Sequence, residues 1–182
     1  MRLKDKVAII TGGSRGIGFA TADAFLREGA KVAVAASSEK NAEAAVEKLK
    51  AIHPDAEVVG ISPNLGSFES VKEEFDKVEK QFGRIDILVN NAGVSESTPF
   101  TSYTEADFDR VIDLNVKGVF NATRAVVDGM IKNHSGVVLN TSSMVSISGQ
   151  PSGFAYPASK FAVNGTTISL ARELGPKGIR VN

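Results

Sequence analysis

The sequence predicts an α/β fold in which two layers of helices enclose one parallel sheet, a doubly wound arrangement with the strand order 3-2-1-4-5-6. Three observations predict it. Short apolar runs alternate with longer segments of helical periodicity along the whole chain. The apolar runs are continuous, which is typical of strands buried on both faces. Each of the first five predicted strands leads into a helix, so right-handed crossovers wind the sheet in both directions.

Each element is predicted from its own pattern. The first and third helices carry apolar residues three and four apart, and Gly83 follows the third as a C-cap. The second helix is rich in Ala, Glu and Lys, which favour helices. The strands are short apolar runs such as KVAII and KVAVA. The predicted elements are, strand and helix in turn, residues 6–10, 16–29, 31–35, 39–52, 57–61, 67–82, 85–89, 105–132, 136–140, 153–174 and 178–182.

The helix predicted over residues 105–132 carries a polar residue on its apolar face. That face consists of Phe108, Ile112, Val119, Thr123, Val126 and Met130. Asn115 occupies the position between Ile112 and Val119, where an apolar residue belongs. A buried amide needs partners, so Asn115 either bonds neighbouring backbone or anchors a water that relays protons to Lys160.

Composition excludes several classes of protein. The 182 residues suit a single domain. The 21 basic and 21 acidic residues balance to zero, which argues against nucleic acid as a partner. The absence of cysteine excludes thiolate zinc sites and a cysteine nucleophile. No apolar run approaches the roughly 18 residues of a membrane span, so we expect no membrane partner and a cytoplasmic protein. His53 and His134 fall in or near predicted loops as surface residues without ligand spacing, and no metal is expected.

A glycine-rich turn, TGGSRGIG over residues 11–18, separates the first strand from the first helix. Glycines let the backbone turn tightly and approach a pyrophosphate, and the helix N-terminus offers unpaired N–H groups. The alternative is a strand-to-helix turn without a ligand. The residues expected to bind the dinucleotide here are Gly12, Ser14, Arg15, Gly16, Ile17 and Gly18.

The end of the second strand distinguishes the two nicotinamide cofactors. An acidic residue there would bond the adenosine ribose and repel a 2′-phosphate. The sequence reads AASS over residues 35–38, with no carboxylate before Glu39. We therefore predict NADP(H) rather than NAD(H), with positive charge from Arg15 and a hydrogen bond from Ser37 to the phosphate. The alternative for Arg15 is a solvated loop cation.

Tyr156 and Lys160 are four residues apart at the start of the last long helix, so both project from one face. Pro157 is tolerated because it stands in the first turn. A free phenol, with a pKa of about 10, is a weak proton donor at neutral pH, and a cation beside it stabilises the phenolate. The pair alone is also compatible with an amphipathic helix that happens to carry both residues.

Ser143 stands thirteen residues before Tyr156, just beyond the fifth strand. Parallel sheets place their sites at the carboxyl ends of strands, so a hydroxyl there could hold a substrate carbonyl oxygen while Tyr156 protonates it. Ser142, Ser146 and Ser148 share this loop, and position alone does not select one of the four.

Together these residues resemble the short-chain dehydrogenase/reductase family, over the whole chain. The resemblance rests on the glycine pattern over 11–18, on NNAG over 90–93, and on Asn115, Ser143 and Tyr156-x-x-x-Lys160. It implies a Rossmann-like fold in which Tyr156 is the general acid and base. Lys160 would bind the nicotinamide ribose and make the phenol more acidic, Ser143 would orient the substrate, and Asn115 would hold a proton-relay water.

The resemblance also implies further cofactor contacts. Asn91, Ala92 and Gly93 would line the adenosine ribose side. Asn64, followed by Leu65, stands where the family usually has an aspartate that contacts adenine. An amide can still donate and accept hydrogen bonds, so binding should survive this change.

Within the family, the Ser-Arg pair of the glycine turn and the serines at 37–38 are most similar to NADPH-dependent 3-oxoacyl-[acyl-carrier-protein] reductases of fatty acid biosynthesis. The resemblance thus implies reduction of a 3-oxoacyl thioester, although acetoacetyl-CoA reductases and sugar or steroid dehydrogenases share the pattern. It implies a homo-oligomer that forms through two long helices, about 105–132 and 153–174.

Family members continue past the position of Asn182 into a substrate-covering lid and a seventh strand, so we expect the chain to be either a fragment or an unusually short homologue. We therefore expect residues 1–182 to form a single dinucleotide-binding and catalytic domain without that lid and strand. The alternatives are a dinucleotide-binding module, or a partner-dependent subunit, without useful turnover.

Overall fold

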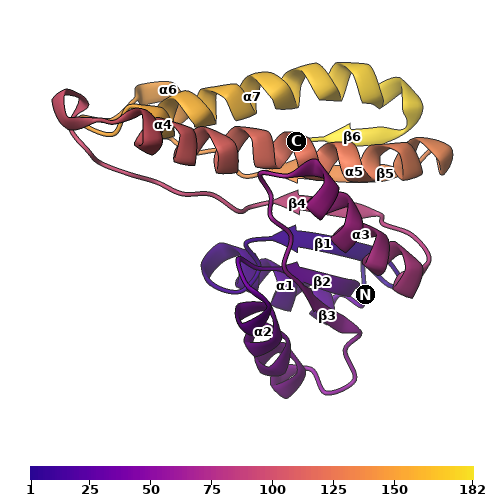
Figure 1. The fold of residues 1–182 in the computed structure, drawn as a ribbon. Helices are drawn as coiled ribbons and strands as arrows, with labels where there is room; N and C mark the ends of the chain where they lie inside the picture. The colour runs from indigo at the N-terminus through magenta and orange to yellow at the C-terminus, as the bar shows by residue number, and fades with distance from the viewer.

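A computed structural model describes residues 1–182 and contains one six-stranded parallel sheet (Figure 1). Its strand order, β3-β2-β1-β4-β5-β6, confirms the prediction. Each pair of neighbouring strands is parallel, and β1 pairs with both β2 and β4 at the centre of the sheet. The strands are β1 (Val7–Thr11), β2 (Lys31–Ala35), β3 (Val58–Ile61), β4 (Ile87–Asn90), β5 (Gly136–Asn140) and β6 (Ile179–Val181).

Helices connect successive strands, as predicted. Three of them begin at a side-chain cap, which is Ser38, Ser67 or Thr104, and α3 ends at Gly83, whose positive φ of 87° suits a glycine. Short 3-10 turns cover Phe100–Ser102 and Gly175–Lys177. The helices are α1 (Gly16–Arg27), α2 (Glu39–Ile52), α3 (Phe68–Phe82), α4 (Glu105–Ile112), α5 (Gly118–Lys132), α6 (Val145–Ser148) and α7 (Ala155–Leu174).

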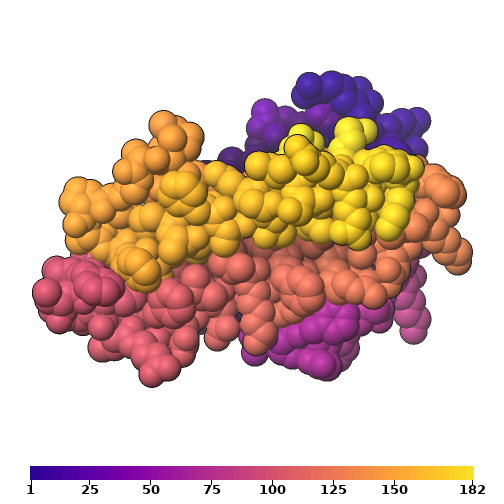
Figure 2. All heavy atoms as spheres, turned by 90° about the horizontal axis from the view of Figure 1, so that it is seen from above, coloured from indigo at the N-terminus to yellow at the C-terminus, as the bar shows by residue number.

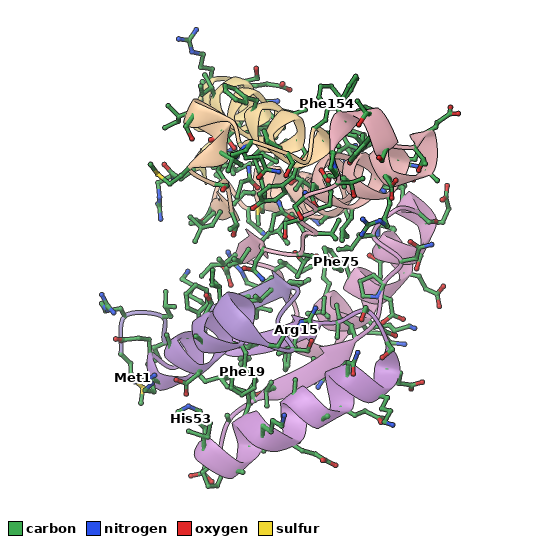
Figure 3. All side chains as sticks on the ribbon, turned by 90° about the vertical axis from the view of Figure 1, so that its left-hand side faces the viewer. Met1, Arg15, Phe19, His53, Phe75 and Phe154 are labelled. Carbon is green, nitrogen blue, oxygen red and sulfur yellow. The ribbon has the colours of Figure 1, made fainter.

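Two apolar clusters hold the helices against the sheet, one on each face. Helices α3 and α5 and the last turns of α7 cover one face, where Phe75 and Met130 are fully buried. Helices α1 and α2 cover the other face, over β1 and β2, where Leu49 is fully buried. Figure 3 shows Phe75 near the centre of the molecule, with Met1 and Phe154 toward its two ends.

Strands β5 and β6 depart from the predicted burial on both faces. Every residue of β1 is buried, whereas burial alternates along the other two strands. Val137 and Leu139 are only half-buried, and Arg180 is exposed. The physical reason is that α1 and α2 lie over the other half of the sheet, so β5 and β6 have a helix layer on one face only.

Residues 105–132, predicted as one helix, form one continuous helical segment that changes from α to π and back to α. A π-helical segment, Asp113–Lys117, joins α4 to α5. Because a π turn contains more residues than an α turn, the buried face changes phase across it. Val111 is fully buried, whereas Phe108, predicted on the apolar face, is 36% exposed. From Val119 onward the predicted face is buried.

Three further details differ from the prediction. The one-turn helix α6 was not predicted, and α7 begins at Ala155 rather than at residue 153, because Gly153 has a φ of +89° that a helix cannot contain. His53 ends α2 half-buried rather than on the surface, with its Nε2 2.7 Å from Oδ1 of Asp23. This hydrogen bond is the main cause that lowers the pKa of Asp23. His134 is exposed.

None of the helices combines the length and apolarity that crossing a membrane requires.

Candidate active site

A cleft of about 690 Å³ lies at the carboxyl ends of the first four strands. It brings together eleven of the predicted cofactor residues, which come from four separate loops. These are Gly12, Ser14, Arg15, Gly16, Ile17, Ser37, Asn64, Leu65, Asn91, Ala92 and Gly93. Sequence reasoning missed Ser62, Pro63 and Leu114, which also line the cleft. A larger hollow, about 880 Å³, lies between α2 and α3 and contains none of the predicted site residues.

The glycine turn leaves the start of α1 open to an anion. Helix α1 has neither a side-chain cap nor an acidic residue in its first turn, so its first N–H groups remain available. Gly12 and Gly16 have φ values of +65° and +55°, which favour glycine. Gly18 does not line the cleft: a Cβ there would lie 2.3 Å from the Gly12 carbonyl oxygen. It therefore allows α1 to pack closely against the turn.

Thr11 and Asn91 lock the end of β1 to the loop that follows β4. The Thr11 hydroxyl oxygen accepts the N–H groups of Asn91 and Ala92, each at 3.0 Å. In return, Nδ2 of Asn91 donates to the carbonyl oxygens of Thr11 (3.1 Å) and Gly12 (3.2 Å). These bonds fix the shape of the cleft floor.

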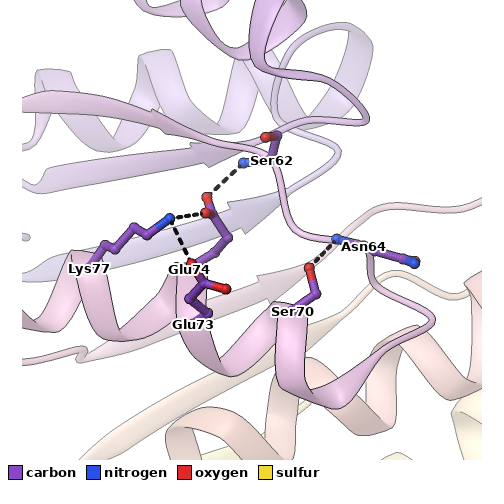
Figure 4. Close-up of polar contacts among 6 residues, drawn as sticks. All are labelled: Ser62, Asn64, Ser70, Glu73, Glu74 and Lys77. Carbon is purple, nitrogen blue, oxygen red and sulfur yellow. Dashed lines mark hydrogen bonds and ion pairs between the residues drawn. The ribbon is translucent and has the colours of Figure 1, made fainter.

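The loop after β3, which carries Ser62 and Asn64, is held to α3 (Figure 4). The Ser62 N–H donates to the Glu74 carboxylate at 3.0 Å, and the Asn64 N–H donates to the Ser70 hydroxyl at 2.9 Å. Burial would raise the pKa of Glu74, but hydrogen bonds from Lys77 and from Ser62 outweigh it and lower that pKa. Glu74 is thus held as a carboxylate that anchors the loop.

The charge of the cleft is carried by one residue. Arg15 is the only charged side chain among the residues that line it, and no Asp or Glu is present. Ser37 lies at the end of β2 on the same cleft. The cleft therefore favours an anionic ligand.

Lys160 lies buried one helical turn from Tyr156, at the start of α7. It is 5% exposed, and its Nζ donates to the carbonyl oxygen of Thr141 at 2.7 Å. The same Nζ lies 5.8 Å from the centre of the Tyr156 ring. Burial lowers the pKa of Lys160 because no carboxylate compensates for its desolvation. Thr141 was not singled out from the sequence, since a main-chain acceptor leaves no sequence signature.

Asn115 is fully buried in the π-helical segment, and its side chain bonds neighbouring backbone, whereas the predicted water relay to Lys160 stays a prediction. Its Oδ1 accepts the Val94 N–H at 2.8 Å, and its Nδ2 donates to the Val94 carbonyl (2.9 Å) and to the Ser159 hydroxyl (3.0 Å). A Cβ on Gly93 would lie 3.2 Å from Oδ1 of Asn115 and 3.7 Å from Nζ of Lys160. Asn115 therefore ties the loop after β4 to the helix that carries Tyr156.

The hydrogen bonds in the loop after β5 distinguish Ser143 from its neighbours. Ser142 donates to Ser146, Ser146 donates to the Ser143 carbonyl, and Ser148 donates to main-chain carbonyls. The Ser143 hydroxyl only accepts a long bond, from the Val145 N–H at 3.4 Å. Of the four serines, Ser143 alone keeps its hydroxyl proton available for another acceptor.

A sequence model of the short chain dehydrogenase family matches residues 6–182. The chain belongs to this family. Short-chain dehydrogenases are oxidoreductases that bind a nicotinamide dinucleotide, NAD or NADP, act on small molecules, and are typically oligomeric.

Two curated relatives match the whole chain. One is a 3alpha-hydroxysteroid dehydrogenase from Mediterraneibacter gnavus, 53% identical over 182 residues, which span 73% of that relative. The other is a 3-oxoacyl-[acyl-carrier-protein] reductase, FabG, from Thermotoga maritima, 41% identical, of which the chain again covers 73%. This short-chain dehydrogenase is therefore similar to enzymes with quite different substrates.

Solved structures share the fold over the full chain. Levodione reductase superposes with a TM-score of 0.95 at 37% identity, and this chain covers 70% of it. A xylitol dehydrogenase with bound NAD+ superposes with the same TM-score of 0.95 at 34% identity, again with 70% of that chain covered.

Proposed function

We propose that this short-chain dehydrogenase is an NADP(H)-dependent carbonyl reductase. The observation that carries the proposal is the buried Lys160 one turn from Tyr156 and next to Gly93, which lines a cleft whose only charged side chain is Arg15. When bound, the dinucleotide supplies the hydride. The residues that would hold it are the glycine turn at its pyrophosphate, Asn64 and Leu65 at the adenine, and Asn91 to Gly93 along the ribose.

The remaining chemistry belongs to side chains of this protein. Tyr156 would protonate the carbonyl oxygen as the ketone carbon is reduced, and would take the proton back in the reverse reaction. The Ser143 hydroxyl, free to donate, would hold that oxygen. The Lys160 side chain, whose Nζ lies 5.8 Å from the centre of the Tyr156 ring, would hold the nicotinamide ribose next to it. A water relay at Asn115 remains a prediction.

The choice of NADP(H) rests on charge. A carboxylate at the end of β2 would repel a 2′-phosphate, and the cleft contains none. Arg15 and Ser37 would both contact this phosphate. Turnover with NADH at equal or greater kcat/KM than with NADPH would contradict this part of the proposal.

Two substrate classes have support. A 3-oxoacyl thioester follows from the FabG relative, and a 3-oxosteroid follows from the relative that is 53% identical. Met144 and Ile147 follow Ser143 and are each 77% exposed. Their apolar side chains suit the hydrophobic flank that both substrates share. A panel containing an acetoacetyl thioester and a 3-oxosteroid, assayed for NADPH oxidation, would rank the two.

The replacement Tyr156→Phe tests the proposed acid. It removes only the hydroxyl, so we expect turnover to fall by about 10²- to 10⁴-fold while the Kd for NADPH stays within about twofold. The measurements are NADPH oxidation and fluorescence titration. Turnover near that of the wild type would contradict the role of Tyr156. If the wild-type chain binds NADPH but does not turn over, the binding-module alternative is correct instead.

We also propose that the protein forms a homo-oligomer through α4, α5 and α7. Helices α5 and α7 lie side by side on one surface (Figure 2). Phe120, Phe161 and Ile168 on these helices are 60%, 52% and 59% exposed, respectively, which is costly for a monomer. We expect light scattering to give at least a dimer and Phe161→Glu to give a monomer. A monomeric wild type would contradict the proposal.

A further inference from the structure

Helix α7, which carries Tyr156, begins without a cap of its own. Helices α2, α3 and α4 start at a serine or threonine whose side chain accepts a first-turn N–H. The residue before α7 is Phe154, which has no polar side-chain atom and makes no such bond. The Tyr156 N–H is one of the groups at a helix start that have no partner within the helix. Its partner is Glu96, sixty residues earlier, whose Oε1 accepts it at 3.3 Å.

Glu96 belongs to a compact set of contacts between two loops. Its second oxygen, Oε2, accepts the Thr98 N–H at 3.1 Å, and its carbonyl oxygen accepts Nε2 of Gln150 at 3.1 Å. The Thr98 carbonyl accepts the Gly153 N–H at 3.0 Å. The loop after β4 is thereby bonded at three points to the segment that enters α7.

The approach of these two segments is close enough to require a glycine. A Cβ on Gly153 would lie 2.2 Å from the Glu96 carbonyl oxygen, and Gly153 has a φ of +89°. The backbone of residues 96–98 therefore lies directly against the turn that precedes Tyr156. The contact leaves little freedom for the start of α7 to shift.

The negative charge of Glu96 also favours its position at the start of α7. The first turn of α7 contains no acidic residue, so Glu96 is the carboxylate at the positive end of this helix. The same carboxylate lies close to Tyr103, whose pKa is raised by burial first and by Glu96 second. Glu96 thus lies half-buried in the protein beside α7, rather than in open solvent.

We propose that Glu96 is a positioning residue: from the loop after β4 it caps the first turn of α7 and so fixes the Tyr156 hydroxyl relative to Ser143 and the cleft. This inference rests on the proposed function of Tyr156. Both carboxylate oxygens are used by main-chain N–H groups, so Glu96 acts through the helix and not on the substrate.

The test compares Glu96→Ala and Glu96→Gln with a matched control, Glu28→Gln. Glu28 also accepts a main-chain N–H, that of Arg2 at 2.7 Å, but at the end of α1, outside the cleft. We expect E96A to lower kcat by about tenfold, because small misplacements of reacting groups are costly, with the Kd for NADPH within about twofold. E96Q, whose amide oxygen can still accept one N–H, should recover most of the lost kcat. E28Q should behave as the wild type.

Amide hydrogen exchange at Tyr156, followed by NMR, gives a readout that does not need turnover. Loss of its acceptor should speed exchange of this amide by about tenfold in E96A and leave it unchanged in E28Q. If the wild type has no turnover, the proposed function fails and exchange alone decides the capping role. Exchange and kcat both within about twofold of the wild type in E96A would overturn the inference. So would a loss of NADPH affinity as large as the loss of kcat. If E96A does not fold, Glu96→Met, which keeps the length of the side chain but offers no oxygen to accept a hydrogen bond, decides: faster exchange at Tyr156 supports the cap, and wild-type exchange overturns it.

Discussion

The two halves of the sheet are built differently although their strands look alike in sequence. Strands β1 and β2 lie between helices on both faces, and all of β1 is buried. Strands β5 and β6 have helices on one face, and Val137 and Leu139 are half-buried on the other. The first half supplies most of the cleft that we propose binds the dinucleotide, and the second supplies Ser143, Tyr156 and Lys160. A continuous apolar run therefore shows that a segment is a strand, but coverage depends on which helices lie above it.

Two matched substitutions of leucine by alanine, one in each half of the sheet, would measure this difference. They have the largest effect on stability that we expect. Leu88 on β4 is fully buried, so Leu88→Ala should cost about 2–5 kcal/mol of unfolding free energy. Leu139 on the neighbouring β5 is half-buried, and Leu139→Ala should cost less than half as much. Urea denaturation would compare them. Equal losses would mean that the outer face of β5 is covered in solution.

Replacement of Arg15 would separate the functions of the two halves. Arg15→Ala removes the only charge that lines the cleft, so the KM for NADPH should rise by about tenfold, or about 1.4 kcal/mol. The kcat and the KM for NADH should stay within about twofold. Tyr156→Phe should show the reverse pattern, with kcat lost and binding kept. A fall in kcat for Arg15→Ala would show that cofactor binding and catalysis are not divided between the two halves of the sheet.

The smallest expected effect is a pH dependence confined to alkaline solution. Burial lowers the pKa of Lys160 below the value of 10.5 that it has when unfolded. At a pH between the folded and the unfolded pKa, Lys160 binds more protons in the unfolded state than in the native state. Its contribution to the free energy of unfolding therefore rises with pH across that window. Relative to Lys160→Met, the wild type should thus gain stability as pH rises toward 10.5. Thermal melts of both proteins would test this, and a parallel pH profile would contradict it.

Much of the fold and most of the cleft follow from the sequence, because local patterns specify them. Continuous apolar runs identified the strands, and the order 3-2-1-4-5-6 is the one expected of the doubly wound sheet that they predict. The glycine turn and the segment after β4 converge because both follow neighbouring parallel strands. The family resemblance selected Ser143, and the structure adds the hydrogen bonds that set it apart.

The features that sequence reasoning missed depend on contacts between distant segments. The π-helical segment has no local signature, so the buried face before Asn115 was predicted one residue out of phase. Glu96 is an ordinary loop glutamate until α7 is placed beside it. Thr141 contributes only its carbonyl to Lys160, and every residue type has one.

The bonding of Asn115 limits which amino acids its position can accommodate. Its side chain pairs with both the N–H and the C=O of Val94, as a neighbouring strand would, and so imitates a peptide group inside a helix. Aspartate, of the same size, would set one oxygen against the Val94 carbonyl and repel it. Leucine would offer Val94 neither a donor nor an acceptor. In a saturation library at codon 115, survivors should therefore be almost exclusively asparagine, a narrower tolerance than the surrounding apolar positions would show.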